Sequence, residues 1–145
     1  MTSDTSPAQA AWLALFRAQT RARNAADAAL KAAGLPPLEW YDVLWELERA
    51  MPGGLRPFEL EKAVLLPQHG ISRLTDRMVK AGMLTRLPCP DDKRGFRLIP
   101  SPAGLKLRQD MWRIYGPVIS GFWEPGLSVD EQAELARLLG AAGRP

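Results

Sequence analysis

The 145-residue sequence predicts a mainly α-helical fold with one small β-hairpin, an α+β arrangement. Three observations lead to this prediction. Apolar residues recur at helical spacing in most segments. Glycines and prolines separate these segments into helical lengths. Only residues 83–100 change period: apolar residues there alternate with arginine and threonine, and prolines accompany them, as is typical of an edge hairpin.

Two helices are predicted before residue 55. The first covers 9–34, is rich in alanine and ends at Gly34, a fitting C-terminal cap, whereas residues 1–8 are expected to be frayed. The second follows a Pro-Pro break and ends at the Pro-Gly-Gly sequence 52–54. It has a dense apolar side, and four acidic residues are expected mostly on its other side: Glu39, Asp42, Glu46 and Glu48.

Two shorter helices are predicted next, at 56–65 and at about 68–81. Pro57 lies in the first turn of the former, where its missing N–H costs nothing. A break of about three residues separates the two helices, and Gly82 ends the second. The spacing i, i+3, i+4, i+7 predicts a buried face made of Ile71, Leu74, Thr75 and Met78.

The hairpin and two further helices complete the chain. The predicted strands are 83–90 and 95–100, with a turn at 90–95. Ser101 caps a helix that runs toward Phe122. Ser128 and Glu131 form a capping box for the last helix. The sequence contains neither repeats nor a dividing linker, so a single domain over 1–145 is expected.

Composition narrows the function. No apolar run is long enough to cross a membrane and no secretion signal is visible, so a cytoplasmic protein is expected. One histidine, one cysteine and no glycine-rich phosphate loop predict no metal site, no cofactor and no enzyme. The net charge is +3, but residues 68–97 carry seven basic and three acidic side chains. This local charge either meets an acidic partner or forms a solvated face.

Two short helices joined by a tight turn and followed by a hairpin have the order of a winged helix-turn-helix, which binds double-stranded DNA. The helix at 68–81 would then enter the major groove. Residues near its N-terminal end are candidates for reading bases: Gln68, His69, Ser72 and Arg73. Arg77 and Lys80 lie further along and are better placed for phosphates. Each of these side chains could instead be solvated.

An ordered series of motifs runs through residues 55–105: Ile71-Ser72-Arg73-Leu74, Asp76-Arg77-Met78, Gly82-Met83-Leu84, Asp92-Lys93-Arg94-Gly95 and Ser101-Pro102-Ala103-Gly104. The series resembles the recognition helix and wing of the MarR family, the multiple-antibiotic-resistance type of bacterial transcription regulator. The resemblance implies a homodimeric repressor on a pseudo-palindromic operator. It also implies that Arg94, helped by Lys93, reaches the minor groove.

The resemblance further implies a division of labour within the domain. Residues 9–34 and 102–142 would be dimerisation helices, and 38–100 would be the DNA-binding lobe. Apolar residues on the outer helices are too numerous for exposed helices of a monomer, although an internal core would account for some of them: Trp12, Leu13, Phe16, Trp112, Ile114, Tyr115, Val118, Ile119, Phe122, Trp123, Leu135 and Leu138.

Many members of the family release DNA when a small, often aromatic and anionic effector binds. The candidate lining here consists of Trp12, Phe16, Trp40, Tyr41, Trp45 and Trp112. Arg17 or Arg113 would be the anion partner. A plain core is the alternative reading of this tryptophan-rich set. Cys89, at the entry to the wing, is read as an incidental thiol rather than as a redox sensor.

Departures from the family pattern fall where bases are read. Pro67 replaces a capping serine, His69 is unusual, and Gly70 inside a helix is expected to cost about 1 kcal/mol relative to alanine. Asp76 and Asp92 are hypothesised to hold an arginine in a DNA-facing rotamer. Two other functions remain open: a winged-helix module for protein–protein contact, and a small-molecule-binding protein that has lost operator recognition.

Overall fold

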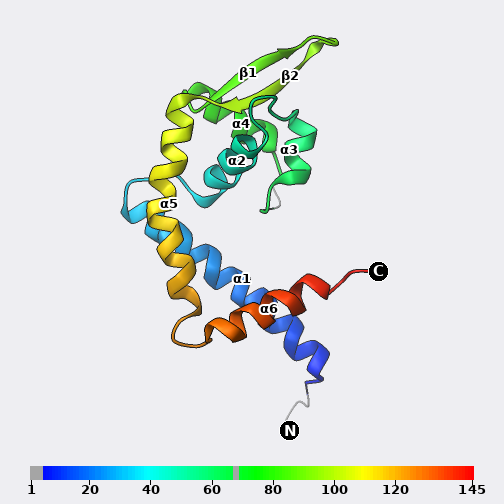
Figure 1. The fold of residues 1–145 in the computed structure, drawn as a ribbon, viewed down its shortest axis with the longest axis vertical. Coiled ribbons are helices and arrows are strands. Elements are labelled where there is room, and N and C mark those ends of the chain that lie inside the picture. Colours follow the sequence, from blue (N-terminus) through cyan, green and yellow to red (C-terminus); the bar gives the residue numbers. More distant parts are fainter. Residues whose placement is uncertain (1–4, 67–68) are drawn as a thin grey trace.

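The computed structural model describes residues 5–66 and 69–145. It confirms a mostly helical fold with one two-stranded antiparallel hairpin (Figure 1). In chain order, the elements are the helices α1 (Pro7–Ala32), α2 (Leu38–Arg49), α3 (Pro57–Ala63) and α4 (Ile71–Lys80), the strands β1 (Leu84–Cys89) and β2 (Asp92–Pro100), and the helices α5 (Pro102–Trp123) and α6 (Val129–Ala141).

The helices α2, α3 and α4 pack beneath the hairpin at one end of the molecule, and we call residues 38–100 the central lobe (Figure 1). Its core joins α2 to α4 and to both strands, because their apolar faces meet in one cluster of buried residues: Val43, Leu44, Leu47, Leu60, Ile71, Leu74, Met78, Leu84 and Leu98. The predicted buried face of α4 is therefore confirmed, and burial of these side chains is the main stabilising term of the lobe.

The helix α5 leads from the hairpin toward α1 and α6, which cross at the opposite end (Figure 1). Ser101 caps α5 by accepting the Gly104 N–H at 3.0 Å, and its hydroxyl donates to the Gly82 carbonyl at 2.5 Å. A Cβ built on Gly104 would lie 2.0 Å from the Met83 carbonyl oxygen, so only glycine lets α5 start this close to the hairpin. These contacts connect α5 to the base of the hairpin.

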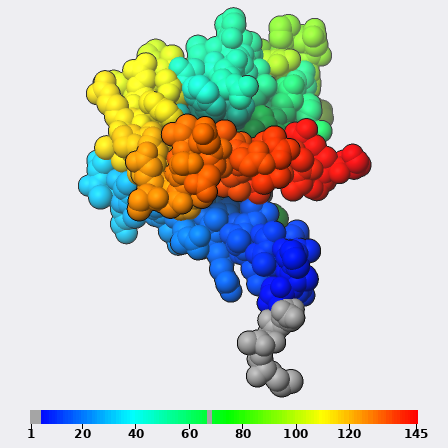
Figure 2. All heavy atoms as spheres, turned by 60° about the horizontal axis from the view of Figure 1, so that its bottom comes forward, coloured from blue at the N-terminus to red at the C-terminus, as the bar shows by residue number. Residues whose placement is uncertain are grey.

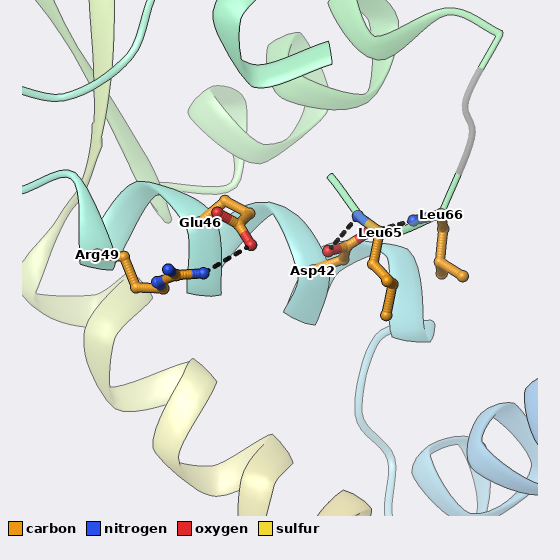
Figure 3. A network of polar contacts seen from close by, with 5 residues as sticks. All are labelled: Asp42, Glu46, Arg49, Leu65 and Leu66. Carbon is orange, nitrogen blue, oxygen red and sulfur yellow. Dashed lines mark hydrogen bonds and ion pairs between the residues drawn. The ribbon is translucent and has the colours of Figure 1, made fainter. Parts of the chain in front are cut away.

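The first helix and α3 differ from their predicted bounds. The helix α1 begins at Pro7 because Ser6 and Gln9 form a capping box, so the expectation that residues 7 and 8 are frayed was wrong. The helix α3 ends at Ala63, two residues early. The chain after it is extended, and its amides at Leu65 and Leu66 donate to the Asp42 carboxylate at 3.0 and 2.7 Å (Figure 3).

Asp42 itself is 7% exposed, so its predicted place among surface charges was also wrong. The two backbone N–H groups compensate its burial, since hydrogen bonds to the charged form offset the loss of hydration. Hydrogen bonds to a single carboxylate of α2 thus hold the backbone that follows α3 in place.

The helix α4 begins at Ile71 rather than near residue 68. Gly70 is its N-cap and has φ of +88°, in the left-handed region that favours glycine. The expected cost of Gly70 inside a helix was therefore wrong, because this residue precedes the helix and adopts a conformation that alanine resists. Pro67 and Gln68 lie outside the described residues.

The second strand of the hairpin is longer than predicted, the first is one residue shorter at each end, and the turn between them is shorter. Leu84 pairs with Pro100, the pairing shifts between Pro88 and Cys89, and Cys89 pairs with Asp92. The strands therefore meet across Pro90 and Asp91 alone. The prediction of a turn over 90–95 was wrong, and the basic residues 93 and 94 belong to β2.

Candidate nucleic-acid interface

The polar face of α4 carries the candidate base and phosphate contacts. Ser72, Arg73, Arg77 and Lys80 are exposed, whereas the residues between them include the buried face of the helix. The hydroxyl of the buried Thr75 donates to the Ser72 carbonyl, so Thr75 is satisfied within the helix. His69 is exposed and precedes α4, and Gln68 lies outside the described residues.

The hairpin places two further cations near its tip. Lys93 and Arg94 are exposed at the start of β2, which projects beyond the helices of the central lobe (Figure 1). In the described ranges 5–66 and 69–145, no carboxylate lies within ion-pair distance of the basic candidates Arg73, Arg77, Lys80, Lys93 and Arg94. Their charges are available to an external anion.

Asp76 and Asp92 do hold arginines, but not those that were named as DNA contacts. The guanidinium of Arg86 on β1 donates to Asp76 on α4 at 2.5 Å and lies over the Phe96 ring at 5.2 Å. Arg56 approaches Asp92 at 4.0 Å, and Asp92 also accepts the Arg94 backbone N–H at 2.9 Å. Together with the 3.7 Å pair of Arg97 and Glu59, these contacts fix the hairpin against α3 and α4.

The sequence did not predict that these arginines pair with acidic residues on other elements and so hold the hairpin in place. Asp76 and Arg86 are ten residues apart and lie on different elements, so no helical or strand spacing links them. The available signal was the presence of acids within a basic segment, which indicates local pairing but does not identify the partner.

The candidate effector residues are only partly brought together. Tyr41, Trp45 and Trp112 line a cavity of about 640 Å³ between α2 and α5. Trp12 and Phe16 contact one another, with ring centroids 5.1 Å apart, on the exposed N-terminal half of α1 and do not line this cavity. Trp40 packs against the apolar clusters instead.

Seven of the ten residues that line this cavity were not anticipated as effector contacts, and two of them, Tyr115 and Arg108, lie on α5. Tyr115 lies one turn after Trp112 on α5, and its ring meets Tyr41 edge-on at 5.1 Å. Arg108, one turn before Trp112, also lines the cavity and is ion-paired with Glu48. The helical spacing 108, 112, 115 was the signal that could have found them. Neither Arg17 nor Arg113 lines the cavity, and Arg113 approaches Asp110 at 3.9 Å.

Burial raises the pKa of both tyrosines in this cavity above the usual value near 10. For Tyr41, burial is the largest cause, and a hydrogen bond from Arg108 opposes it. For Tyr115, burial again dominates, and the negative charge of Asp42 contributes. Both phenols are therefore neutral at physiological pH.

Cys89 is buried in the hairpin. Across residues 5–66 and 69–145, His, Cys, Asp and Glu do not gather in threes as a metal site would need. No helix in that part of the chain is long and apolar enough to span a membrane.

Comparisons with known proteins match this geometry. The family model described as MarR family matches residues 33–95. The multiple antibiotic resistance protein MarR of Salmonella typhimurium is 31% identical over 87 residues, which cover 60% of each chain. The matched chain thus spans about three fifths of the length of this curated relative.

Solved structures extend the likeness over most of the chain. A mutant MarR from Escherichia coli complexed with operator DNA has a TM-score of 0.79 at 23% identity, covering 90% of this chain and 91% of that one. An organohalide-sensing transcriptional regulator in its 2,4-dichlorophenol-bound form has a TM-score of 0.79 at 20% identity, covering 94% and 79%. These structures show the shared winged-helix fold. The central lobe, where the family model matches, is thus similar to MarR-family proteins in sequence, and most of the chain is similar to them in fold.

Proposed function

We propose that this protein is a homodimeric transcription regulator that binds a specific double-stranded DNA site and acts as a ligand-responsive repressor. The observation that carries the proposal is the set of unpaired, exposed cations on α4 and β2 of a winged-helix lobe. A recognition helix with a free basic face suits a major groove, and an arginine near a hairpin tip suits the narrow, electronegative minor groove.

Specific roles follow from position. Ser72 and Arg73 lie in the first turn of α4, where base edges are reached, and Arg77 and Lys80 lie one and two turns later, nearer the phosphates. Arg94, with Lys93, is assigned to the minor groove, and Gln68 and His69 remain candidates beside the helix start. The DNA-bound relative supports this assignment.

The outer helices support a dimer. The helix α6 has no buried residue and forms a ridge across the surface beside α1 (Figure 2). On α1 only Ala26 and Leu30 are buried, whereas Trp12 and Phe16 are 64% and 51% exposed. Such apolar surface is costly in water, so we assign 9–34 and 102–142 to dimerisation and 38–100 to DNA binding.

The cavity between α2 and α5 is the proposed effector site. It lies where the outer helix α5 meets the DNA-binding lobe, so a ligand there can change their relative placement. The relative with bound 2,4-dichlorophenol supports a small aromatic ligand. Of the six residues first considered, Tyr41, Trp45 and Trp112 are retained for direct contact.

The experiment that tests the proposal is selection of duplexes from a random DNA pool by the purified protein. A two-fold symmetric sequence, with half-sites about one helical turn apart, is the expected product. Enrichment of no sequence would contradict specific DNA binding and would favour one of the two non-DNA functions.

A further inference from the structure

The cavity between α2 and α5 has aromatic walls, and we call it the aromatic pocket. Tyr41 stacks with Trp45 at 6.5 Å between centroids and with Trp112 at 5.9 Å, and Tyr115 meets both Tyr41 and Trp112 edge-on. Its volume of about 640 Å³ is within the range of about 300–1,000 Å³ that small-molecule sites occupy.

The charged groups of this pocket are two carboxylates and one guanidinium. Asp42 and Glu46 line it from successive turns of α2, and Figure 3 shows both side chains on that helix. Arg108 lines it from α5. Asp42 remains an acceptor of two backbone N–H groups, and Glu46 meets Arg49 at 3.4 Å, with Arg49 60% exposed to solvent. Charges this well buried are screened less than surface charges.

The single guanidinium is already engaged. Arg108 is ion-paired with Glu48, and its side chain is 14% exposed. The same guanidinium lies over the Trp45 ring at 5.5 Å, so one aromatic face of the pocket already holds a cation. An anionic ligand would have to displace Glu48 to reach Arg108. It would also lie beside the carboxylates of Asp42 and Glu46, which would repel it.

We propose that the aromatic pocket binds an aromatic compound carrying a quaternary or protonated ammonium group. Electron-rich ring faces attract such a cation, and the carboxylates of Asp42 and Glu46 complement its charge. This inference names the ligand class of the proposed effector site and therefore rests on the proposed function for its regulatory meaning. The preferred charge is the opposite of the anionic effector that the family resemblance implies.

Calorimetry on the protein without DNA tests the charge preference with three probes of similar size. These are phenyltrimethylammonium, its uncharged isostere tert-butylbenzene, and the anion benzenesulfonate. At about 0.15 M salt, the cation is expected to bind at least tenfold more tightly than either of the others. Equal or tighter binding of the hydrocarbon or the anion would overturn the proposal, as would binding of none of the three.

Single substitutions test whether the cation binds in the aromatic pocket. Glu46→Gln removes one negative charge from the lining at constant shape, and it should weaken phenyltrimethylammonium about three- to tenfold while leaving tert-butylbenzene unchanged. Trp112→Leu should weaken the cation more than the hydrocarbon, because leucine keeps apolar contact but has no ring face. The matched control is Glu61→Gln on the exposed side of α3, which should bind all probes as the wild type does. Equal effects of both glutamine variants would place the cation elsewhere and overturn the proposal.

The two proposals fail differently. If the cation binds with these variant effects but leaves DNA affinity unchanged, the pocket assignment holds and ligand responsiveness fails. If the protein selects DNA but prefers the neutral or anionic probe, the DNA-binding function stands and the charge preference is overturned.

Discussion

Arg73 and Arg77 are separated by one turn on the same exposed face of α4, and neither has an acidic partner among the described residues. Their chemistry is identical, so any difference in their effect must come from position along the helix. In the proposed DNA complex, Arg73 would lie near the end of α4 that enters the groove first, and Arg77 would lie nearer the DNA backbone.

Arg73→Ala should relax sequence preference at one position of each half-site and cost about 1–3 kcal/mol of binding free energy on the preferred duplex. Arg77→Ala should weaken all duplexes alike and reduce the salt slope by about one. Titrations of both variants against the selected duplex and a scrambled one measure this. Identical behaviour of the two variants would refute separate roles.

Asp76 and Arg86 are both about half-exposed, so their ion pair contributes little to folding. Its value is positional, since it connects α4 to β1. Asp76→Asn should therefore change the free energy of unfolding by less than about 1 kcal/mol, as urea titration would show. It should nevertheless weaken binding to the preferred duplex. Binding that is unchanged, or strengthened by removal of a negative charge, would contradict this role.

At the scale of elements, the start of α4 depends on backbone conformation. A Cβ on Gly70 would meet no atom within 4 Å, so the only cost of a side chain there is the positive φ. An L-residue in the left-handed region costs roughly 1–2 kcal/mol. The residue at the start of α4 is therefore a glycine whose own conformation lies outside the helix.

Gly70→Ala should lower the free energy of unfolding by about 1–2 kcal/mol, measured by urea denaturation. The control is Gly53→Ala, outside the helices assigned to dimerisation, where a Cβ would meet only the Ala50 carbonyl oxygen at 3.9 Å and φ is not positive. That variant should be destabilised less than Gly70→Ala, because its backbone conformation does not favour glycine. Equal destabilisation of both proteins would show that strain at Gly70 is not the cause.

Element identity was predictable from the sequence because periodicity records burial. Periodicity predicted the buried face of Ile71, Leu74 and Met78, and the Ser-x-x-Glu motif predicted the capping box of Ser128. Helix boundaries were harder to predict. The positive φ of Gly70 is a local backbone conformation that apolar spacing does not reveal, and the path of the chain after α3 depends on tertiary contacts with Asp42. Sequence spacing carries no information about such contacts.

Of the two candidate sites, the set of proposed DNA contacts on α4 was predictable from the sequence and the aromatic pocket as a whole was not. The exposed residues of α4 share a helix face, so spacing alone groups them. The aromatic pocket joins α2 to α5, some seventy residues apart. Composition suggested Trp12 and Phe16 for the effector site and did not single out Tyr115 and Arg108. Only the packing of α5 on α2 distinguishes these residues.

At the scale of the whole molecule, a single chain leaves large apolar side chains of its outer helices exposed. Phe16 on α1 and Phe58 on α3 are similarly exposed, at 51% and 57%, but Phe16 belongs to the proposed dimer surface and Phe58 to the central lobe. Substitutions at these two residues therefore distinguish an effect on dimerisation from the effect of removing any exposed apolar side chain.

Sedimentation equilibrium should give a mass of about 32 kDa for the wild type, twice the 16.0 kDa of one chain. Phe16→Glu should shift the protein toward the monomer, because a charge would be buried at the interface. Phe58→Glu should remain dimeric. A monomeric wild type, or dissociation of both variants alike, would contradict the assignment of α1 to dimerisation.

The free cations of α4 and β2 form the proposed sequence-specific DNA interface. Binding of the wild-type protein to the DNA upstream of its own coding sequence, over a series of salt concentrations, tests this most directly. The protein should prefer this DNA over random duplex, and log K should fall linearly and steeply with log salt, because phosphate contacts release counterions. Absence of any preference at about 0.15 M salt would contradict sequence-specific binding.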